Sequence, residues 1–318
     1  MKENSALQDK RSAKPVQAPA AVEEAVKPVE KQKNTKTIGI IAEDLTIFHT
    51  PSIIDGISEF MEEKGYTLLM GNMRLYQKYG NFYKEKNYDS LVEDEVQQML
   101  AKRVAGIIYI EGHYHVMDNI SELFSVPLVA VYGRVKNPEI TSIIYDDEQG
   151  GYEATRELIA NGHRKLGLIK GTEASYHTLE RRKGFLRALY EYQIPFNPSW
   201  EISGDWNRID GYEGAKRLVK EGVTGIFAMN DLMAAGVYDY AAKHNLTIGK
   251  DLSVIGFDNR EICAAFTPAL STMALPLRKM GTIAADYLIQ KIEHPEPSHQ
   301  DEYKIPCEIL KRKSVCRL

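Results

Sequence analysis

The stretch that decides the fold runs from Gly225 to Asn259 and reads GIFAMNDLMAAGVYDYAAKHNLTIGKDLSVIGFDN. It opens on a short apolar run, continues with a helical segment that begins near Asp231, and closes on a second apolar run that ends at Asp258. Two apolar runs around one helical segment are typical of a β-α-β unit with parallel strands. Polar side chains directly after such strands stand where ligands bind in open parallel sheets.

The same alternation extends in both directions from this stretch. A first series of predicted strands covers 37–43, 66–72, 104–112, 127–133 and 142–147, and a second series covers 165–171, 200–206, 225–231 and 251–259. Helical stretches separate them, including one at 148–162 that ends at Gly162 and others that begin near Thr178 and Asp210. The sequence therefore predicts an α/β protein with two doubly wound parallel-sheet lobes.

The last part of the chain leaves one helix, about 277–292, and one strand-like run, 303–315, after both series are complete. We expect each lobe to take one of them, so that three chain crossings form a hinge. The predicted division is 1–36 as a linker or tail, 37–148 plus about 276–300 as the N-terminal lobe, and about 149–275 plus 301–318 as the C-terminal lobe.

Composition excludes several classes of protein. Apolar residues make up 43% and charged residues 26% of the 318 residues, which is ordinary for a folded globular chain. Residues 1–36 carry eight Lys or Arg against five Asp or Glu, a net charge of about +3. Because the whole chain carries −4, residues 37–318 carry about −7. Such a core is poorly suited to bind a phosphate backbone.

The sequence also carries no signal for an exported role. We find no apolar run of the ~18 to 20 residues that span a bilayer, and no secretory signal, so we expect a cytoplasmic protein without membrane contact. The three cysteines, Cys263, Cys307 and Cys316, match no metal or redox spacing and are expected to be reduced thiols.

The candidate ligand contacts are polar and aromatic residues that follow predicted strands, together with Arg181 in the helical segment LERRKGFLRAL. A carboxylate, a guanidinium and an aromatic plane around one cleft suit a polyhydroxylated molecule, because the first two pair with hydroxyls and the third stacks on a sugar ring. At such a strand end we expect Asp258 to be solvated or paired with ligand rather than buried. The candidates are His49, Thr50, Tyr132, Asp146, Arg181, Trp206, Asn230 and Asp258.

Plainer interpretations apply to several of these positions. Asp231 and Asp210 stand where helix N-caps belong, and Asn259 fits a turn or cap. Arg181 could be one more solvated helix charge, and Trp206 could be ordinary core. Glu111, His113 and His115 alternate in EGHYH, but no fourth ligand is identifiable and we predict no metal site.

No enzyme signature is present in the sequence. It lacks G-x-G-x-x-G after the first strand, G-x-x-x-x-G-K-[ST], G-x-S-x-G and H-E-x-x-H. We therefore expect neither an enzyme nor a bound cofactor, although a sugar-acting enzyme stays a third alternative.

Seven segments in order resemble the lac and gal repressor family: TIGIIAEDL, KRVAGIIYI, YDDEQGGYEATRELIANGHRKLGLIKG, ERRKGFLRAL, GDWNRIDGY, GIFAMNDLMAAGVYDYA and DLSVIGFDNREICAAFTPALSTM. The resemblance covers about 37–318. It implies a two-lobe core similar to periplasmic sugar-binding proteins, with a three-strand hinge, an effector in the interlobe cleft, and a homodimer. The candidate cleft residues favour a sugar or sugar derivative as this effector. Ligand binding would then change affinity for operator DNA by lobe rearrangement, as in an effector-controlled transcriptional repressor.

The resemblance also assigns residues. The family's effector-contact Arg falls on Arg181 and its cleft Asp on Asp258, the aromatic after the GD strand on Trp206, and the Asn of the ND pair on Asn230. First-loop contacts fall near His49 and Thr50, and Tyr132 and Asp146 complete the set.

Two departures from the family stand out. The usual helix-turn-helix before the first core strand is replaced by the low-complexity segment 1–36, so operator DNA would be bound only through a module not present here, and Met1 is expected to be an internal start or a truncated gene model. Leu275 stands where the family often has Gln. The alternative function is a stand-alone solute-binding protein of a sugar transport system.

Overall fold

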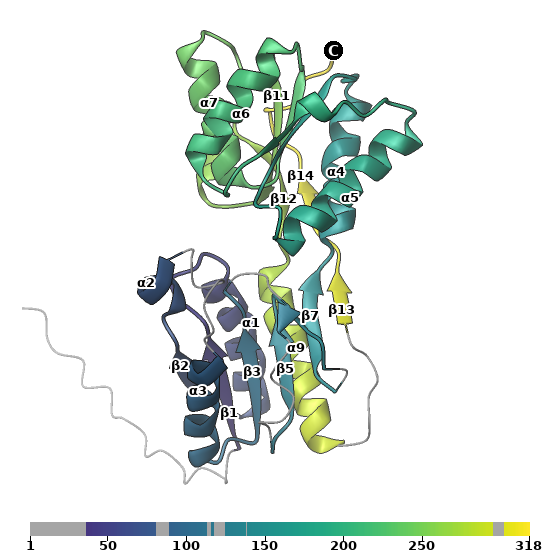
Figure 1. The fold of residues 1–318 in the computed structure, drawn as a ribbon. Coiled ribbons are helices and arrows are strands. Elements are labelled where there is room, and N and C mark those ends of the chain that lie inside the picture. Colours follow the sequence, from purple (N-terminus) through teal and green to yellow (C-terminus); the bar gives the residue numbers. More distant parts are fainter. Residues whose placement is uncertain (1–35, 81–88, 113–115, 118–124, 138, 295–301) are drawn as a thin grey trace, which may run out of the picture. The chain divides into compact units, whose positions relative to one another are not determined.

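The computed structural model describes residues 36–80, 89–112, 116–117, 125–137, 139–294 and 302–318. Two six-stranded sheets dominate this part of the chain, each with helices packed on it (Figure 1). The short strands β4 (Val116–Met117) and β6 (Arg134–Val135) pair in parallel as a separate small sheet. The α/β class and the two parallel-dominated sheets expected from the sequence are confirmed.

The first sheet has the order β13-β7-β5-β3-β1-β2, and all its neighbours run parallel. Its central strands are rich in Ile and Val and are buried along their whole length, as is typical of parallel strands covered on both faces. Their bounds are β1 Thr37–Ala42, β2 Thr67–Asn72, β3 Gly106–Ile110, β5 Leu128–Val131, β7 Thr141–Tyr145 and β13 Glu302–Ile305.

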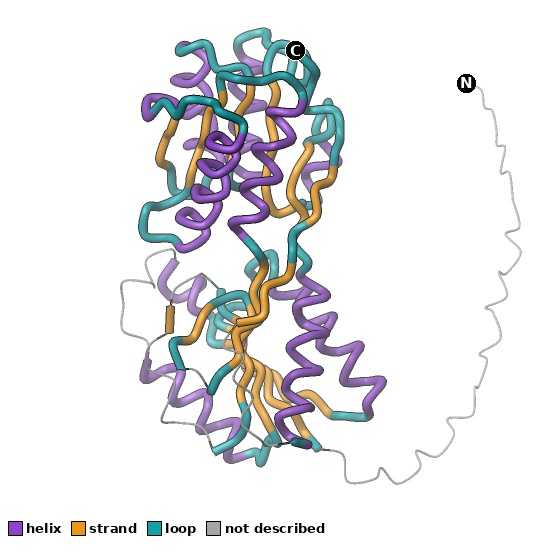
Figure 2. The backbone as a smooth tube through the Cα atoms, turned by 90° about the vertical axis from the view of Figure 1, so that its right-hand side faces the viewer, coloured by secondary structure: helices purple, strands orange, loops and turns teal. Residues whose placement is uncertain are grey.

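Helices cover both faces of this sheet (Figure 2). On one face α1 (Thr50–Lys64) packs against α9 (Leu277–Glu293) and shares a buried cluster with Ile108. On the other, α3 (Asp89–Ala101) shares a second cluster with Ile107, while α2 (Leu75–Tyr79) follows β2. Adjacent residues of β3 thus point to opposite layers, as the two-residue repeat of a strand requires.

The second sheet has the order β14-β12-β11-β10-β8-β9, with only β14 antiparallel to its neighbour among the described strands. The sequence stretch 225–259 forms β10, α7 and β11, with Gly225 paired to Ser253 in register. The bounds are β8 Leu166–Lys170, β9 Glu201–Ser203, β10 Gly225–Ala228, β11 Ser253–Asp258, β12 Ser271–Ala274 and β14 Glu308–Leu310.

Two helix pairs flank the second sheet and are held close by glycines. In the first pair, α4 (Asp147–Ala160) and α5 (Tyr176–Glu191), a Cβ at Gly184 would overlap the carbonyl oxygen of Glu148, and one at Gly151 would overlap that of Arg181. These glycines therefore let two backbones touch beside Arg181. The second pair consists of α6 (Arg208–Lys220) and α7 (Asp231–Lys243). The short helix α8 (Ile262–Ala265) and the 3-10 turn η2 (Pro198–Trp200) also belong to this part of the chain.

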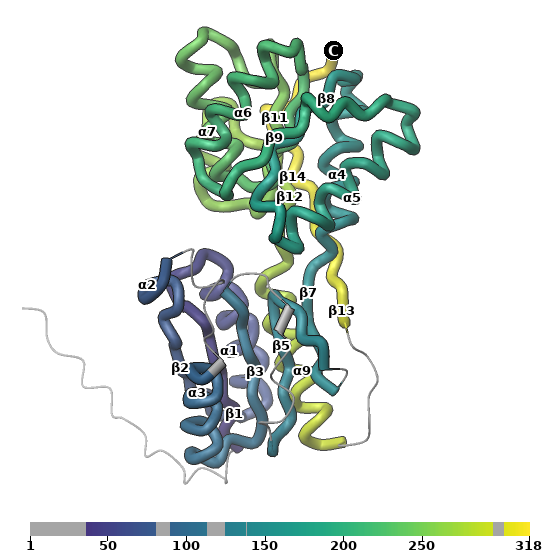
Figure 3. Tube along the Cα trace, viewed as in Figure 1, coloured from purple at the N-terminus to yellow at the C-terminus, as the bar shows by residue number. Residues whose placement is uncertain are grey.

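Three chain segments pass between the sheets, and Figure 3 lets the reader follow them. They join β7 to α4, β12 to α9, and β13 to β14. The expected boundaries placed 301–318 together in the C-terminal lobe, but strand pairing places 302–305 in the first sheet and 308–310 in the second. Pro306, between the two strands, lacks the N–H that a continuous ladder needs.

Candidate ligand site

Several predicted ligand contacts lie at the carboxyl ends of strands. Tyr132 follows β5, Asp146 follows β7, and Asp258 is the last residue of β11. The backbone is left-handed at Tyr132 (φ 76°) and at Asp258 (φ 114°). Non-glycine residues rarely adopt such angles, which cost on the order of 1–3 kcal/mol and gather at ligand sites.

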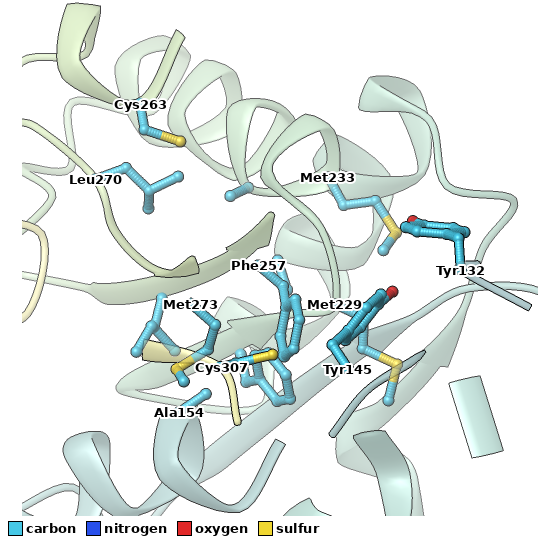
Figure 4. Close-up of a cluster of buried hydrophobic side chains, with 14 of the residues drawn as sticks. Tyr132, Tyr145, Ala154, Met229, Met233, Phe257, Cys263, Leu270, Met273 and Cys307 are labelled. Carbon is cyan, nitrogen blue, oxygen red and sulfur yellow. The ribbon is translucent and has the colours of Figure 1, made fainter. Parts of the chain in front are cut away.

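Arg181 lies at the centre of the predicted set, although it is almost fully buried, with 2% of its surface exposed. Its Nε donates to Asp147 Oδ1 at 2.7 Å, its Nη2 donates to the Tyr145 hydroxyl at 2.9 Å, and its Nη1 donates to the Met229 carbonyl. The guanidinium carbon lies 3.7 Å from the Phe257 ring centre. Figure 4 shows the side chains of Phe257, Tyr145 and Met229 next to one another. The alternative interpretation of Arg181 as a solvated helix charge is therefore wrong.

Asp147 is the main anionic partner of Arg181. Its second oxygen lies 2.7 Å from Nδ1 of His177, so one buried carboxylate joins two side chains of α5. Burial alone would raise the pKa of Asp147, but His177 and Arg181 outweigh burial and lower it below its ordinary value. Asp147 consequently holds Arg181 in place as an ionised group.

The neighbouring Asp146, the residue predicted as a ligand contact, occupies a different position. Its side chain accepts from the backbone N–H of Gln149 at 3.0 Å and so caps α4. An Asp three residues before a Gln at a helix start is the capping pattern, and this signal distinguishes it from Asp147 in the sequence. The carboxylate at Arg181 is the second of the pair.

Asp258 is buried, with 8% of its surface exposed, where a solvated or ligand-paired side chain was expected. One oxygen lies 3.3 Å from Nε of Arg260 and the other 3.8 Å from Nη1 of Arg181. Burial raises the pKa of Asp258, and the two arginines only partly oppose that rise. Two cations therefore share one carboxylate at the end of β11.

Two stacked ring pairs line the ends of β5 and β7. Tyr132 stacks on His49 with ring centres 3.6 Å apart, and Tyr145 stacks on His177 at 5.3 Å. Tyr132 also meets His177 edge-on at 5.4 Å. These contacts bring two predicted residues, Tyr132 and His49, into one aromatic group with two residues that the sequence analysis did not select.

Trp206 and Asn230 lie together on the second sheet. Trp206 is half-buried with φ 63°, and its ring centre is 5.7 Å from the Arg181 guanidinium carbon. Asn230 donates to the Trp206 carbonyl at 2.9 Å and accepts from the Met233 N–H at 2.7 Å, which caps α7. The amide of Asn230 thus fixes the Trp206 loop onto α7.

Thr50 and His49 open α1. The Thr50 hydroxyl donates to the Asp44 carbonyl at 3.0 Å, and Nε2 of His49 lies 2.9 Å from the Glu111 carbonyl. Both side chains are buried. They fix the first loop against the end of β3.

Asp231 is the first residue of α7, next to the Asn230 cap, and it is fully buried. It accepts from the Thr272 hydroxyl at 2.6 Å and from the Arg260 N–H at 2.8 Å. Burial, followed by the charge of Asp258, raises the pKa of Asp231 to about 7. Asn259, with φ 53°, accepts from Arg312 at 2.8 Å, in line with a turn role.

The described residues contain no group of three or more His, Cys, Asp or Glu that could hold a metal ion. His113 and His115 of the weak metal pattern lie outside the described residues, as does segment 1–35. Cys263, Cys307 and Cys316 are free thiols. Within the described ranges, no helix has both the length and the apolar character that crossing a bilayer demands.

Known proteins are similar to this chain in sequence and in fold. A family described as periplasmic binding protein-like domain matches residues 155–315. The HTH-type transcriptional repressor PurR of Photobacterium profundum is 30% identical over 94% of this chain and 85% of its own length. Its counterpart in Escherichia coli is 29% identical over 90% of this chain and 81% of its own length.

Solved structures of transcriptional regulators are similar to this chain in fold. A LacI-family transcriptional regulator from Rhizobium etli matches with a TM-score of 0.75 and 25% identity, over 88% of this chain and 99% of that one. A LacI-family regulator from Enterococcus faecium with bound ribose matches with a TM-score of 0.67 and 24% identity, over 89% of this chain and 100% of that one. The chain therefore belongs to the lac and gal repressor family, and it contains the ligand-sensing core of a transcriptional regulator.

Proposed function

We propose that this core binds a sugar or sugar derivative between its two sheets, through Arg181 and Asp258, and that binding changes operator affinity by rearranging the lobes. The observation that carries the proposal is the Arg181 guanidinium, which lies between Asp147, Asp258 and three aromatic rings. A guanidinium has five N–H donors in a fixed fork, which suits adjacent hydroxyls.

In the proposed complex, ligand hydroxyls exchange with the contacts that Nη1 and Nη2 make to the Met229 carbonyl and the Tyr145 hydroxyl. Nε stays with Asp147, which keeps the fork oriented. Tyr132, His49 and Trp206 then supply ring faces. Asn230 holds the Trp206 loop, Thr50 holds the loop of His49, and Asp146 holds the start of α4. A ligand that lacks one of these hydroxyls leaves a buried group unpaired, which costs about 1–3 kcal/mol.

The chemistry around Arg181 supports a sensor rather than a catalyst. The carboxylates of Asp147 and Asp258 are paired with Arg181 and Arg260, and the relatives are named repressors. Both observations support our proposal that this protein is not an enzyme and needs no cofactor. The lac repressor structure bound to operator is a dimer. Because this chain is similar to that repressor, we propose that it acts as a cytoplasmic homodimer. Its operator contacts would come from a helix-turn-helix module rather than from the core.

A screen followed by calorimetry tests the proposal. Monosaccharides, disaccharides, nucleosides and purines are screened by thermal shift, because a ligand that binds only the folded state raises its melting temperature. Each hit is titrated into the wild type, Arg181→Lys and Asp258→Asn, with expected losses of at least about tenfold, since each variant removes a charge-assisted bond. Asp239→Asn, which alters the exposed Arg208–Asp239 pair, is the control. Unchanged affinity in both site variants contradicts the site.

A further inference from the structure

Asp231 is a buried acidic group that the proposed ligand contacts do not include. Its side chain is fully buried at the start of α7, where the side chain of Asn230 already caps the helix. Gly256 on β11 leaves room for it, because a Cβ at that position would lie 2.3 Å from Oδ1 of Asp231. Helix capping therefore does not explain this carboxylate, which lies against the strand that ends at Asp258.

The groups that bind Asp231 are neutral hydrogen-bond donors. The Thr272 hydroxyl lies 2.6 Å from Oδ1, the backbone N–H of Arg260 donates to Oδ2 at 2.8 Å, and the Cys263 thiol is a further hydrogen-bond partner. The side chain of Arg260 binds elsewhere, with its Nε 3.3 Å from Oδ2 of Asp258. A buried carboxylate that has only neutral partners is costly as an anion, and it avoids this cost when it takes up a proton.

The contact between Asp231 and Thr272 suits a carboxyl group that gains and loses a proton. The Thr272 hydroxyl accepts from the Asn259 N–H at 3.3 Å, and the Met273 carbonyl lies 3.5 Å from it as an acceptor. When Asp231 is ionised, the hydroxyl donates to Oδ1. When Asp231 is protonated, Oδ1 donates to the hydroxyl, which turns its own hydrogen toward Met273. Both protonation states therefore keep the 2.6 Å contact with the heavy atoms in place.

Asp231 also holds the turn that carries Asp258. The backbone is left-handed at Asp258 (φ 114°) and at Asn259 (φ 53°), two consecutive residues that are not glycine. Such backbone persists only where its surroundings fix it. Here the N–H of Asn259 binds Thr272 and the N–H of Arg260 binds Asp231. A hydrogen bond to an ionised carboxylate is roughly twice as strong as one to a neutral group, so a proton on Asp231 loosens the hold on the turn.

Charged and titratable groups from several elements surround the two carboxylates. They are Arg260 after β11, Cys263 on α8, Arg181 on α5, Asp147 on α4 with His177 bound to it, Tyr132 after β5, and Arg312 near the C-terminus. Burial raises the pKa of the Cys263 thiol, which therefore stays a neutral donor. Burial is also the main cause that raises the pKa of Asp231 to about 7, and the charge of Asp258 is the next.

We propose that Asp231 binds a proton reversibly near neutral pH and acts as a positioning residue for Asp258, so that the ligand site responds to pH. The link runs through Arg260, whose backbone N–H binds Asp231 while its side chain binds Asp258. The proton site is measured without a ligand, and only its effect on ligand binding rests on the proposed function.

Infrared difference spectroscopy on the whole protein tests the proton site. A protonated carboxyl group has a C=O band that disappears when the group ionises, and ordinary Asp and Glu side chains are almost fully ionised above pH 5.5. The wild type is expected to lose such a band with a midpoint near pH 7. Asp231→Asn should lack this change. Asp258→Asn should keep it with a midpoint at least about half a pH unit lower, because a neighbouring negative charge is removed.

Three spectroscopic outcomes overturn the proposal. They are a wild type without such a band, a band that persists unchanged in Asp231→Asn, and an unshifted midpoint in Asp258→Asn. The first is measured on the unaltered protein, so it decides the matter even if a variant does not fold.

Melting temperatures provide a second measurement of the proton site. The folded pKa of Asp231 lies above the unfolded value, so the stability that the proton contributes is lost as pH rises through about 7. Between pH 5.5 and pH 8, the melting temperature of Asp231→Asn minus that of the wild type should therefore rise by at least about 2 °C. The difference cancels groups that titrate elsewhere, such as His163. Asp239→Asn, at an exposed ion pair, should give a flat difference. A flat difference for Asp231→Asn contradicts the proton site.

A ligand from the thermal-shift screen extends the test to binding. Its affinity for the wild type should differ at least about threefold between pH 6 and pH 8, and Asp231→Asn should bring this ratio close to one. An equal ratio in the two proteins overturns the positioning role but leaves the proposed ligand site intact. A screen without any ligand counts against the proposed function instead, while the proton site is decided by the spectra.

Discussion

Nε of Arg181 donates to Oδ1 of Asp147 across 2.7 Å, and this bond links the second turn of α5 to the first turn of α4 in a setting where both side chains are almost fully buried. Asp147 comes two residues after β7, so the bond also fixes the point where the chain leaves the first sheet for the second. It ties the proposed ligand contact to a chain crossing.

Asp147→Ala should therefore destabilise the protein strongly. Removal of one partner of a buried ion pair leaves the other charge uncompensated and typically costs about 3–5 kcal/mol. Urea unfolding at neutral pH measures the loss. The adjacent Asp146→Ala is the matched comparison, because it removes only a helix cap and should cost about 1 kcal/mol. Equal losses at the two positions would contradict the role assigned to Asp147.

Gly184→Ala tests the close approach of α4 and α5. A methyl group at this position would overlap the carbonyl of Glu148, so the helices must separate, at a cost of about 1–3 kcal/mol. Because Arg181 lies one turn earlier on α5, we also expect weaker ligand binding. Tyr190→Ala, on a side chain of the same helix that is 85% exposed, should stay within about 0.5 kcal/mol of the wild type. A neutral effect of Gly184→Ala would show that the contact is not tight.

His163 should make the protein less stable in mild acid. Burial lowers the pKa of this imidazole below its ordinary 6.5, and its nitrogens contact Thr224 at 3.0 Å and the Cys316 carbonyl at 3.1 Å. As pH falls below 6.5, the unfolded chain takes up a proton that the folded protein resists, so unfolding becomes easier.

Melting temperatures at pH 7.5 and pH 5.5 measure this effect. The decrease between them should be smaller in His163→Gln than in the wild type, while His294→Gln, at an exposed position, should retain the full decrease. Parallel pH profiles for all three proteins would remove His163 from the account.

Trp206 should report ligand binding by fluorescence. The chain has two tryptophans, so Trp200→Phe leaves Trp206 as the single indole. Its ring is half-buried and lies 5.7 Å from the Arg181 guanidinium, and a ligand that changes this neighbour or stacks on the ring should change its emission. A ligand with calorimetric affinity that leaves the emission untouched would place Trp206 outside the site.

The sequence predicted what depends on local pattern. Apolar runs and their spacing predicted two parallel sheets, and the resemblance selected Arg181 and Asp258, which the structure brings within 3.8 Å of each other. Whether these residues bind a ligand stays a prediction.

Features that depend on distant parts of the chain were not predictable in this way. The packing of α5 on α4 places His177 and Arg181 on Asp147, and no periodicity within either helix contains that information. The burial of Asp258 likewise depends on Arg260 and Arg181, which reach it from different segments. The assignment of 302–305 to the first sheet is set by pairing with β7, about 160 residues earlier.

That pairing has a consequence for how the protein is made. The edge strand β13 completes a sheet whose other strands lie before residue 146, and α9 also packs on them. At a synthesis rate of roughly 5–20 residues per second, β7 waits roughly 8–30 seconds for its partner. During that interval the second sheet gains all its strands except β14, so we expect the nascent C-terminal half to approach its folded state before the N-terminal half can close its edge.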